Sequence, residues 1–271
     1  MDKIRVALIG MGRMGRQIAK RMSDEDDLRV VCAVAALGSS EIGKDVGLLA
    51  GVGNFNVIVE EADHIDDVLK KSKPDVAVDF TTADACVKNA GIIAKHGVDL
   101  VIGTTGFSEQ QLKELKSIVK DGKVGAVVSP NFSIGVNVYW HILRQAAKML
   151  PGYDVEIVEA HHRFKKDAPS GTALKTAEVI AEALNQNLKE CGVYGRKGDC
   201  LRKQGEIGIH SIRAGDIVGE HTVYFGTIGE HLEFKHVAHS RDAFVNGVLK
   251  AIRFVKGRKG YYGMDDVLGF K

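Results

Sequence analysis

The stretch Lys3-Ile-Arg-Val-Ala-Leu-Ile9, followed at once by Gly10-Met-Gly-Arg-Met-Gly15, decides the fold of this chain. The first segment is short and mostly apolar, which predicts a buried strand, and the glycines after it predict a tight turn into a helix. Backbone N–H groups at such a turn can approach a pyrophosphate, which the positive end of the helix stabilises. The pattern therefore predicts a dinucleotide site made of Gly10, Met11, Gly12, Arg13, Met14 and Gly15.

The first half of the chain alternates apolar runs with helical periodicity. Such alternation predicts a parallel sheet covered on both faces, as in an α/β, doubly wound Rossmann-type domain. Ser108 and Gln111 form a capping-box pattern at the start of one helix. We expect strands at 3–9, 28–36, 55–59, 75–80, 99–102 and 124–128, and helices at 14–22, 65–71, 83–96 and 108–120.

The pattern changes after about residue 131, where strands begin to follow one another without helices between them. Such meanders form antiparallel or mixed sheets, so we expect an α+β domain over 132–239 behind a dinucleotide-binding domain over 1–131. The expected elements are helices at 134–150, 171–190 and 241–256, and strands at 154–160, 207–213, 221–225 and 231–237.

The composition excludes several classes of protein. The 271 residues are 45% hydrophobic with a net charge of only +2, so bulk electrostatics predict no nucleic-acid partner. No apolar run approaches the roughly 18 residues that a membrane span needs, and the N-terminus does not resemble a signal peptide. The four cysteines lack metal-type spacing, although a zinc site at Cys191 and Cys200 is an alternative. We expect a cytoplasmic protein with reduced cysteines and no metal.

Two further loops follow predicted strands, at the edge where open α/β sheets bind ligands. They are Gly103-Thr-Thr-Gly-Phe107 and Ser129-Pro-Asn-Phe-Ser133, and each is either a cofactor contact or an ordinary strand-to-helix turn.

The second predicted strand ends in Ala35-Ala36, without the acidic residue that usually binds the ribose. With Arg13, Ser39 and Ser40 available, both NADPH and NADH are expected, with a slight preference for NADPH.

The segment Glu159-Ala-His-His-Arg-Phe-Lys-Lys-Asp-Ala-Pro-Ser-Gly-Thr172 is the most informative one. It is either a solvated polar loop with a helix cap at Ser170 or a catalytic site. Imidazoles exchange protons near neutral pH, a lysine can bind a carboxylate, and Ser-Gly-Thr at a helix start offers N–H groups to an anion. Adjacent histidines on a strand face opposite ways, and no HExxH pattern accompanies them, which argues against a shared metal ion.

These motifs together resemble the 4-hydroxy-tetrahydrodipicolinate reductase (dihydrodipicolinate reductase) family. The resemblance covers nearly the whole chain and rests on Gly12–Gly15, Gly103–Phe107, Pro130–Ser133 and Glu159–Ala173. It continues through Arg213–Val223 and Ser240-Arg-Asp-Ala-Phe. Two features depart from the family pattern: the glycine loop is one residue shorter, and Ala35-Ala36 replaces an acidic and basic pair.

The resemblance implies NAD(P)H-dependent reduction of a cyclic imine dicarboxylate in the lysine/diaminopimelate pathway. It also implies a homotetramer built through the second domain, and a return of residues 240–271 to the first domain. In that reading, His161 is the general acid/base and Lys165 the proton donor. The implied substrate contacts are His162, Ser170, Gly171 and Thr172, and the implied cofactor contacts are Gly10–Gly15, Gly103, Thr104, Thr105, Ser129, Pro130, Asn131 and Phe132.

Two other functions remain open from the residues. A different Rossmann dehydrogenase, acting on an amino-acid semialdehyde or a sugar, would not require the His-His, Lys and Ser-Gly-Thr set. A nucleotide-sensing protein without enzymatic activity would keep Gly10–Gly15 but tolerate the loss of His161 and Lys165.

Overall fold

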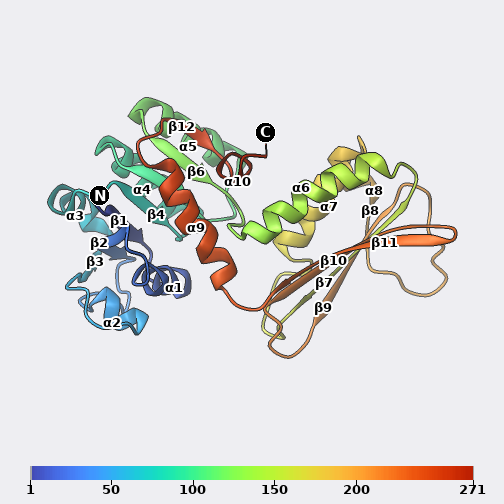
Figure 1. The fold of residues 1–271 in the computed structure, drawn as a ribbon, viewed down its shortest axis with the longest axis horizontal. Helices are drawn as coiled ribbons and strands as arrows, with labels where there is room; N and C mark the ends of the chain where they lie inside the picture. The colour runs from blue at the N-terminus through green and yellow to red at the C-terminus, as the bar shows by residue number, and fades with distance from the viewer. Residues whose placement is uncertain (1, 271) are drawn as a thin grey trace. The chain divides into compact units, whose positions relative to one another are not determined.

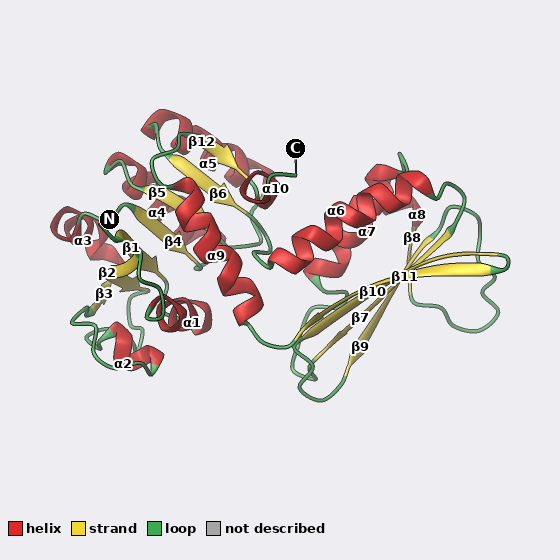
Figure 2. Cartoon of the chain, viewed as in Figure 1, coloured by secondary structure: helices red, strands yellow, loops and turns green. Residues whose placement is uncertain are grey.

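The computed structural model describes residues 2–270, so residues 1 and 271 of the expected first domain lie outside it. The chain forms two compact units. The first contains the residues up to Ser133 and from Phe244 onward, and the second is Ile134–Ala243. Figures 1 and 2 show that each unit has its own sheet and its own helices.

The first unit is built on a parallel sheet of seven strands in the order β12-β6-β5-β4-β1-β2-β3. Alternate residues of β1 enter different cores: Val6 and Leu8 pack into one apolar cluster, and Ala7 and Ile9 into another. Both faces are therefore buried, which confirms the predicted α/β, doubly wound fold. The strands are β1 (Ile4–Ile9), β2 (Leu28–Ala35), β3 (Val59–Glu61), β4 (Val76–Asp79), β5 (Asp99–Ile102), β6 (Gly125–Val128) and β12 (Gly260–Tyr262).

Helices cover the two faces of this sheet (Figure 2). The capping box at α5 forms as predicted: the Gln111 N–H donates to Ser108 Oγ over 3.2 Å, and the Ser108 N–H donates to Gln111 Oε1 over 2.8 Å. Within residues 2–270 no helix has the length and apolar character to cross a membrane. The helices are α1 (Arg13–Met22), α2 (Val46–Ala50), the 3-10 turn η1 (Ala62–His64), α3 (Ile65–Ser72), α4 (Ala83–Lys95), α5 (Glu109–Gly122), α9 (Asp242–Val255) and α10 (Met264–Leu268).

The second unit has a five-stranded sheet in the order β11-β10-β7-β9-β8. β7 pairs antiparallel with β10 but parallel with β9, so the sheet is mixed, as predicted. Helices α6 and α7 cover one face, where Ile157, Ile209 and Val223 join their apolar residues in one core. The elements are α6 (Ile134–Met149), β7 (Asp154–His161), α7 (Gly171–Ala183), α8 (Leu188–Cys191), β8 (Gly192–Tyr194), β9 (Ile207–Arg213), β10 (Gly219–Thr227) and β11 (Glu230–Ala238).

Two predicted elements are wrong in extent. The strand expected at 55–59 is mostly loop, because the buried Asp45 carboxylate accepts the N–H groups of Phe55 and Val57 at 3.0 and 2.9 Å. The helix expected at 171–190 ends at Ala183, and Asn187 caps the separate helix α8 by accepting the Lys189 N–H over 3.1 Å.

Asp99 joins three elements of the first unit. Its nearly buried carboxylate accepts the N–H of Gly125 on β6 through Oδ1, and that of Gly257 beyond α9 through Oδ2, each over 2.7 Å. Burial raises the pKa of Asp99, while the two backbone donors oppose this effect. The pair of bonds attaches the end of α9 to the sheet.

We expect Asp99→Asn to lower the free energy of unfolding by about 1–3 kcal/mol. The amide has one oxygen, so one of the two N–H groups would face the new NH₂ group instead of an acceptor. Urea denaturation measures the change, with Asp26→Asn at an exposed site as the matched control. Equal midpoints for the two variants would contradict the role of Asp99.

Candidate active site

The glycine loop between β1 and α1 has the shape that a dinucleotide phosphate requires. Gly10 has a φ of +96°, which favours glycine, and a Cβ on Gly15 would lie 2.1 Å from the Gly10 carbonyl oxygen. A Cβ on Gly12, by contrast, would meet no atom within 4 Å, so space remains beside the loop at the start of α1. These residues fit a bound pyrophosphate, whereas the Met11 side chain is buried in the core.

The two other predicted cofactor loops are held by buried polar groups. Asp79, at the end of β4, accepts the Thr104 hydroxyl over 2.8 Å and the Thr81 N–H over 3.0 Å. Burial raises the pKa of Asp79 despite these donors. In the next loop Ser129 Oγ donates to the Asn131 carbonyl over 2.8 Å. Gly103 packs against the Phe80 ring, Thr105 and Pro130 are exposed, and Phe132 lies in the core.

The loop after β2 contains a carboxylate that the sequence did not lead us to expect there. The Glu41 carboxylate accepts hydrogen bonds from the Arg16 guanidinium and from the Ser39 hydroxyl. Arg16 also donates from Nε to the Met11 carbonyl over 3.2 Å, so it connects Glu41 to the glycine loop. The Ser39 hydroxyl therefore donates to a carboxylate. Arg13, by contrast, is the first residue of α1 and is exposed.

Glu159 is the centre of the second unit's polar cluster. Its side chain has no exposed surface, and its Oε2 lies 2.5 Å from His161 Nδ1. Arg213 donates to both carboxylate oxygens over 2.8 Å, and the Ser170 N–H donates to Oε1 over 3.1 Å. Burial alone would raise the pKa of Glu159, but these hydrogen bonds outweigh it and hold the pKa well below its usual range.

The opposite side of the His161 ring is also enclosed. The ring of His221 packs against it edge-on, with centroids 5.2 Å apart, and a Cβ on Gly219 would lie 3.1 Å from His161 Nε2. His221 Nε2 lies 3.1 Å from Ser170 Oγ. Burial lowers the pKa of His221 to about 3, with the nearby His161 contributing, so His221 is neutral at pH 7. The ring of His161 is thereby fixed in one orientation.

Lys165 and the start of α7 already hold a carboxylate. Lys165 Nζ lies 2.9 Å from both oxygens of Asp167. Burial alone would raise the pKa of Asp167, but Lys165, with smaller contributions from backbone N–H groups that include Gly171, holds it below its usual range. A Cβ on Gly171 would meet no atom within 4 Å, so the helix start is open on that side. Next to it, Ser170 caps α7 by accepting the Ala173 N–H, and Thr172 lies in its first turn. His162, just past β7, has a buried Nδ1 without a hydrogen-bond partner within residues 2–270.

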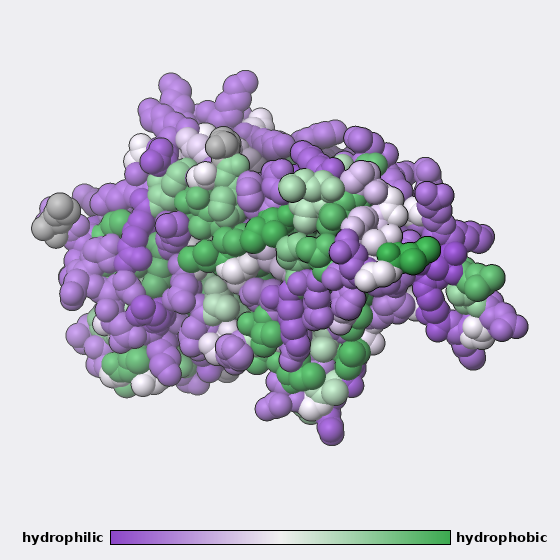
Figure 3. Space-filling model, turned by 45° about the vertical axis from the view of Figure 1, so that its right-hand side comes forward, coloured by the Kyte–Doolittle hydropathy of each residue, from purple (hydrophilic) through white to green (hydrophobic). Residues whose placement is uncertain are grey.

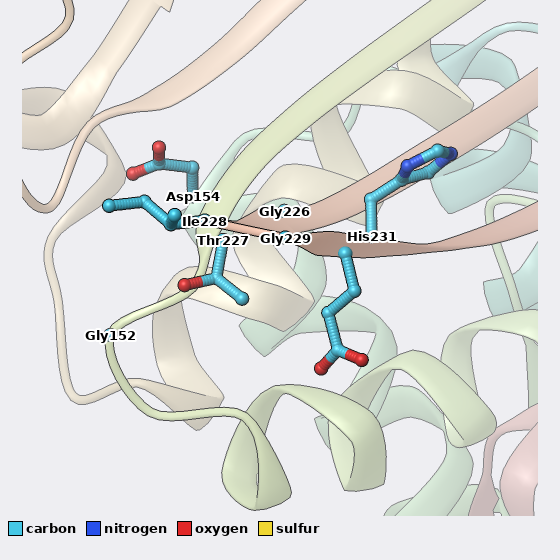
Figure 4. Close-up of a pocket in the computed structure, with 8 residues that line it drawn as sticks. Gly152, Asp154, Gly226, Thr227, Ile228, Gly229 and His231 are labelled. Atoms are coloured by element: carbon cyan, nitrogen blue, oxygen red, sulfur yellow. The ribbon is translucent and has the colours of Figure 1, made fainter.

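A surface hollow of about 550 Å³ lies elsewhere in the same unit. Figure 4 shows its lining, which comes from the β10–β11 turn and from Gly152 and Asp154 before and at the start of β7. None of the predicted site residues lines it, because His161 is at the other end of β7. Within the described residues no group of three or more His, Cys, Asp or Glu side chains is placed to hold a metal ion.

Sequence reasoning missed the partners of His161. Arg213, Gly219 and His221 come from β9 and β10, 52 to 60 residues further along the chain than His161. Glu159 was quoted in the segment but given no role. The signal for Glu159 was its spacing: residues two apart on a strand share a face, so Glu159 and His161 lie together. No comparable local signal identifies His221.

Comparisons with known proteins agree over both units. A family model described as dihydrodipicolinate reductase, N-terminus, matches residues 4–132, and one described as dihydrodipicolinate reductase, C-terminus, matches 135–268. The chain is 52% identical over 269 residues to a 4-hydroxy-tetrahydrodipicolinate reductase of Methanocaldococcus jannaschii, covering 98% of this chain and 97% of the relative. It is 48% identical to the Methanosarcina barkeri protein of the same name, over 98% and 99% of the two chains.

Solved structures give the same relationship. The chain matches a dipicolinate-bound dihydrodipicolinate reductase from Paenisporosarcina with a TM-score of 0.79 and 29% identity, covering 97% of this chain and 99% of the other. An amine dehydrogenase from Mycobacterium smegmatis matches with a TM-score of 0.61 over 97% and 95% of the two chains. At 16% identity this second match shows the fold alone.

We expect Glu159→Gln to reduce stability at pH 7 by on the order of 3 kcal/mol, because it leaves the Arg213 charge without its buried partner. The native pKa of Glu159 is depressed, so the stability it contributes is present above its ordinary value of 4.5 and is lost as the pH falls below that value. Urea denaturation at several pH values measures this. The exposed Glu182→Gln on α7 is the control. A gap between wild type and Glu159→Gln that stays constant down to pH 3 would be the contrary result.

Proposed function

The chain belongs to the dihydrodipicolinate reductase family, and we propose from this premise that His161 and Lys165 carry the proton chemistry of its reaction. The protein is an NAD(P)H-dependent oxidoreductase of lysine and diaminopimelate biosynthesis, a 4-hydroxy-tetrahydrodipicolinate reductase like its relatives. Family membership over both units favours this function over a semialdehyde dehydrogenase, a sugar dehydrogenase or a nucleotide sensor.

A bound NADH or NADPH supplies the hydride for this reduction. Gly10–Gly15 would hold the pyrophosphate, because the space beside Gly12 at the start of α1 admits an anion. We assign further cofactor contacts to two other loops. These contacts are Gly103, Thr104 and Thr105 after β5, and Ser129, Pro130, Asn131 and Phe132 after β6.

The arrangement of Lys165 and Gly171 is the observation that supports this substrate site most directly. Lys165 holds both oxygens of the Asp167 carboxylate beside the open start of α7 at Gly171, so the same groups suit a carboxylate of a cyclic imine dicarboxylate. Ser170, Thr172 and His162 would complete the contacts with the substrate. Reduction adds a proton as well as a hydride, and Lys165 would donate that proton.

His161 would act as the general acid/base. Glu159 accepts from its Nδ1, which orients the ring and leaves Nε2 for proton exchange. In this proposal Glu159 and Arg213 are positioning residues, because they contact His161 or its partner rather than the substrate.

We expect His161→Ala to lower kcat by roughly 10²–10⁴-fold with a smaller change in KM, as the loss of a general acid/base would. Lys165→Ala should lower kcat and also raise KM, because it removes both a proton donor and a carboxylate partner. A coupled assay with freshly generated substrate, following cofactor absorbance, measures both. Lys148→Ala, at an exposed position of α6, is the control. Wild-type rates in both active-site variants would refute these roles.

We further propose that the second unit also serves oligomerisation. The face of its sheet away from α6 and α7 carries Ile212 beside Ala160, with Glu220 and Val237 on the same row. Ile212 is 46% exposed and Val237 37%, and apolar residues gather in several areas of the visible face in Figure 3. Exposed apolar surface of this kind is typical of subunit interfaces, and a homotetramer would bury it.

The domain assignment follows from the same reading. Residues 1–131, joined by 240–271, would form the dinucleotide-binding domain. Residues 132–239 would form the substrate-binding and oligomerisation domain. The function fits a cytoplasmic enzyme with a small dicarboxylate substrate.

We expect the wild-type protein to have the mass of a tetramer in light scattering after size exclusion, and Ile212→Asp to shift it to smaller species. A charge in an apolar interface must lose its water without gaining a partner. Leu48→Asp, at an exposed apolar position of the first unit, should leave the mass unchanged. A wild-type monomer, or an Ile212→Asp tetramer, would exclude this face as the interface.

A further inference from the structure

The loop after β2 contains an acid–base cluster that is hydrogen-bonded to the glycine loop. Its members are Ser39, Glu41 and Arg16. Arg16 reaches the Met11 carbonyl with Nε and Glu41 with Nη2, so a single guanidinium separates the Glu41 carboxylate from that loop. The loop containing Glu41 leaves the carboxyl end of β2, the edge where dinucleotide sheets bind the adenosine ribose.

Glu41 is suited to the role of the ribose-binding acid, which is missing at the end of the second strand itself. In dinucleotide domains an acid near the end of the second strand accepts the ribose hydroxyls of NAD, whereas an arginine there accommodates the 2′-phosphate of NADP. Here the strand ends in Ala35. The chain then turns, with the Ser39 N–H donating to the Ala36 carbonyl over 3.0 Å, and Glu41 follows two residues later.

The hydrogen bonds also determine which groups remain for a phosphate. The cluster has one charged donor, the Arg16 guanidinium, and one neutral donor, the Ser39 hydroxyl. Both donate to the Glu41 carboxylate. These are the two kinds of group that would otherwise bind a 2′-phosphate. The same donors hold the pKa of Glu41 below its usual range, the Ser39 hydroxyl most strongly, so the carboxylate is charged at neutral pH.

We propose that Glu41 sets the cofactor preference of this enzyme in favour of NADH, by accepting the adenosine ribose hydroxyls and by occupying Arg16 and Ser39. The proposal rests on the function proposed above and reverses the slight preference for NADPH drawn from the sequence. A 2′-phosphate would meet the negative charge of Glu41 and would have to displace it from its two donors. Two like charges within several ångströms repel even in a largely aqueous setting.

Binding of two probes that lack the nicotinamide tests this directly. The probes are ADP-ribose and its 2′-phosphate, titrated by calorimetry into the full-length wild-type protein and into Glu41→Gln. We expect wild type to bind ADP-ribose more tightly. In Glu41→Gln the ratio of the two Kd values should shift roughly tenfold toward the 2′-phosphate, because Arg16 and Ser39 become available. Glu114→Gln, at an exposed position of α5, should keep the wild-type ratio.

A parallel measurement of kcat/KM with NADH and NADPH separates this inference from the proposed function. The ratio of the two kcat/KM values should shift in the same direction in Glu41→Gln. If wild type turned over with neither cofactor while the probe ratio shifted, the reductase function would be refuted and the role of Glu41 supported. An unchanged probe ratio in a folded Glu41→Gln protein, verified by its melting temperature, would overturn the role of Glu41. Tighter wild-type binding of the 2′-phosphate would overturn it as well.

Discussion

The second unit depends on the burial of the Glu159 carboxylate. Removing a charged group from water is costly, and it is tolerated only where donors are fixed around it. Glu159 has such donors from three parts of the unit: Arg213 on β9, the Ser170 N–H before α7, and His161 at the end of β7. Each of the three donors is held by the same carboxylate, so one buried charge positions the His161 ring, the start of α7 and the pair of strands β7 and β9.

Buried carboxylates also hold separate parts of the chain together in the first unit. Asp79 fixes Thr81 and Thr104 at the ends of β4 and β5, and Asp99 attaches β6 and the chain after α9 to β5. Each acid lies at an end of a strand, where backbone donors have no ladder partner. At both places a carboxylate accepts hydrogen bonds from groups that have no partner in the strand ladder.

Much of the fold could be predicted from short-range signals. The alternation of apolar runs and helices gave the parallel sheet, and Ser108 with Gln111 marked the start of α5. Errors arose where a distant group overrode local propensity: the apolar run at 55–59 is bonded to Asp45 instead of a neighbouring strand for most of its length. The short strands β8 and β12 depend on pairing with β9 and β6, and three residues carry too little periodicity to reveal that pairing.

The site shows the same division between local and distant information. His161, Lys165 and Ser170–Thr172 are proposed as site residues because they occur within one segment of chain whose residue types suit proton exchange and anion binding, and the family resemblance implies their individual roles. Arg213 and His221 act on His161 across strands, so their roles depend on the register of β7 with β9 and β10. Glu41 is a third case: it lies past the strand end where an acid is normally sought, and only the turn at Ser39 brings its carboxylate back toward Arg16. The proposed cofactor preference therefore rests on the geometry of a loop, whereas the proposed catalytic residues lie close together in the sequence.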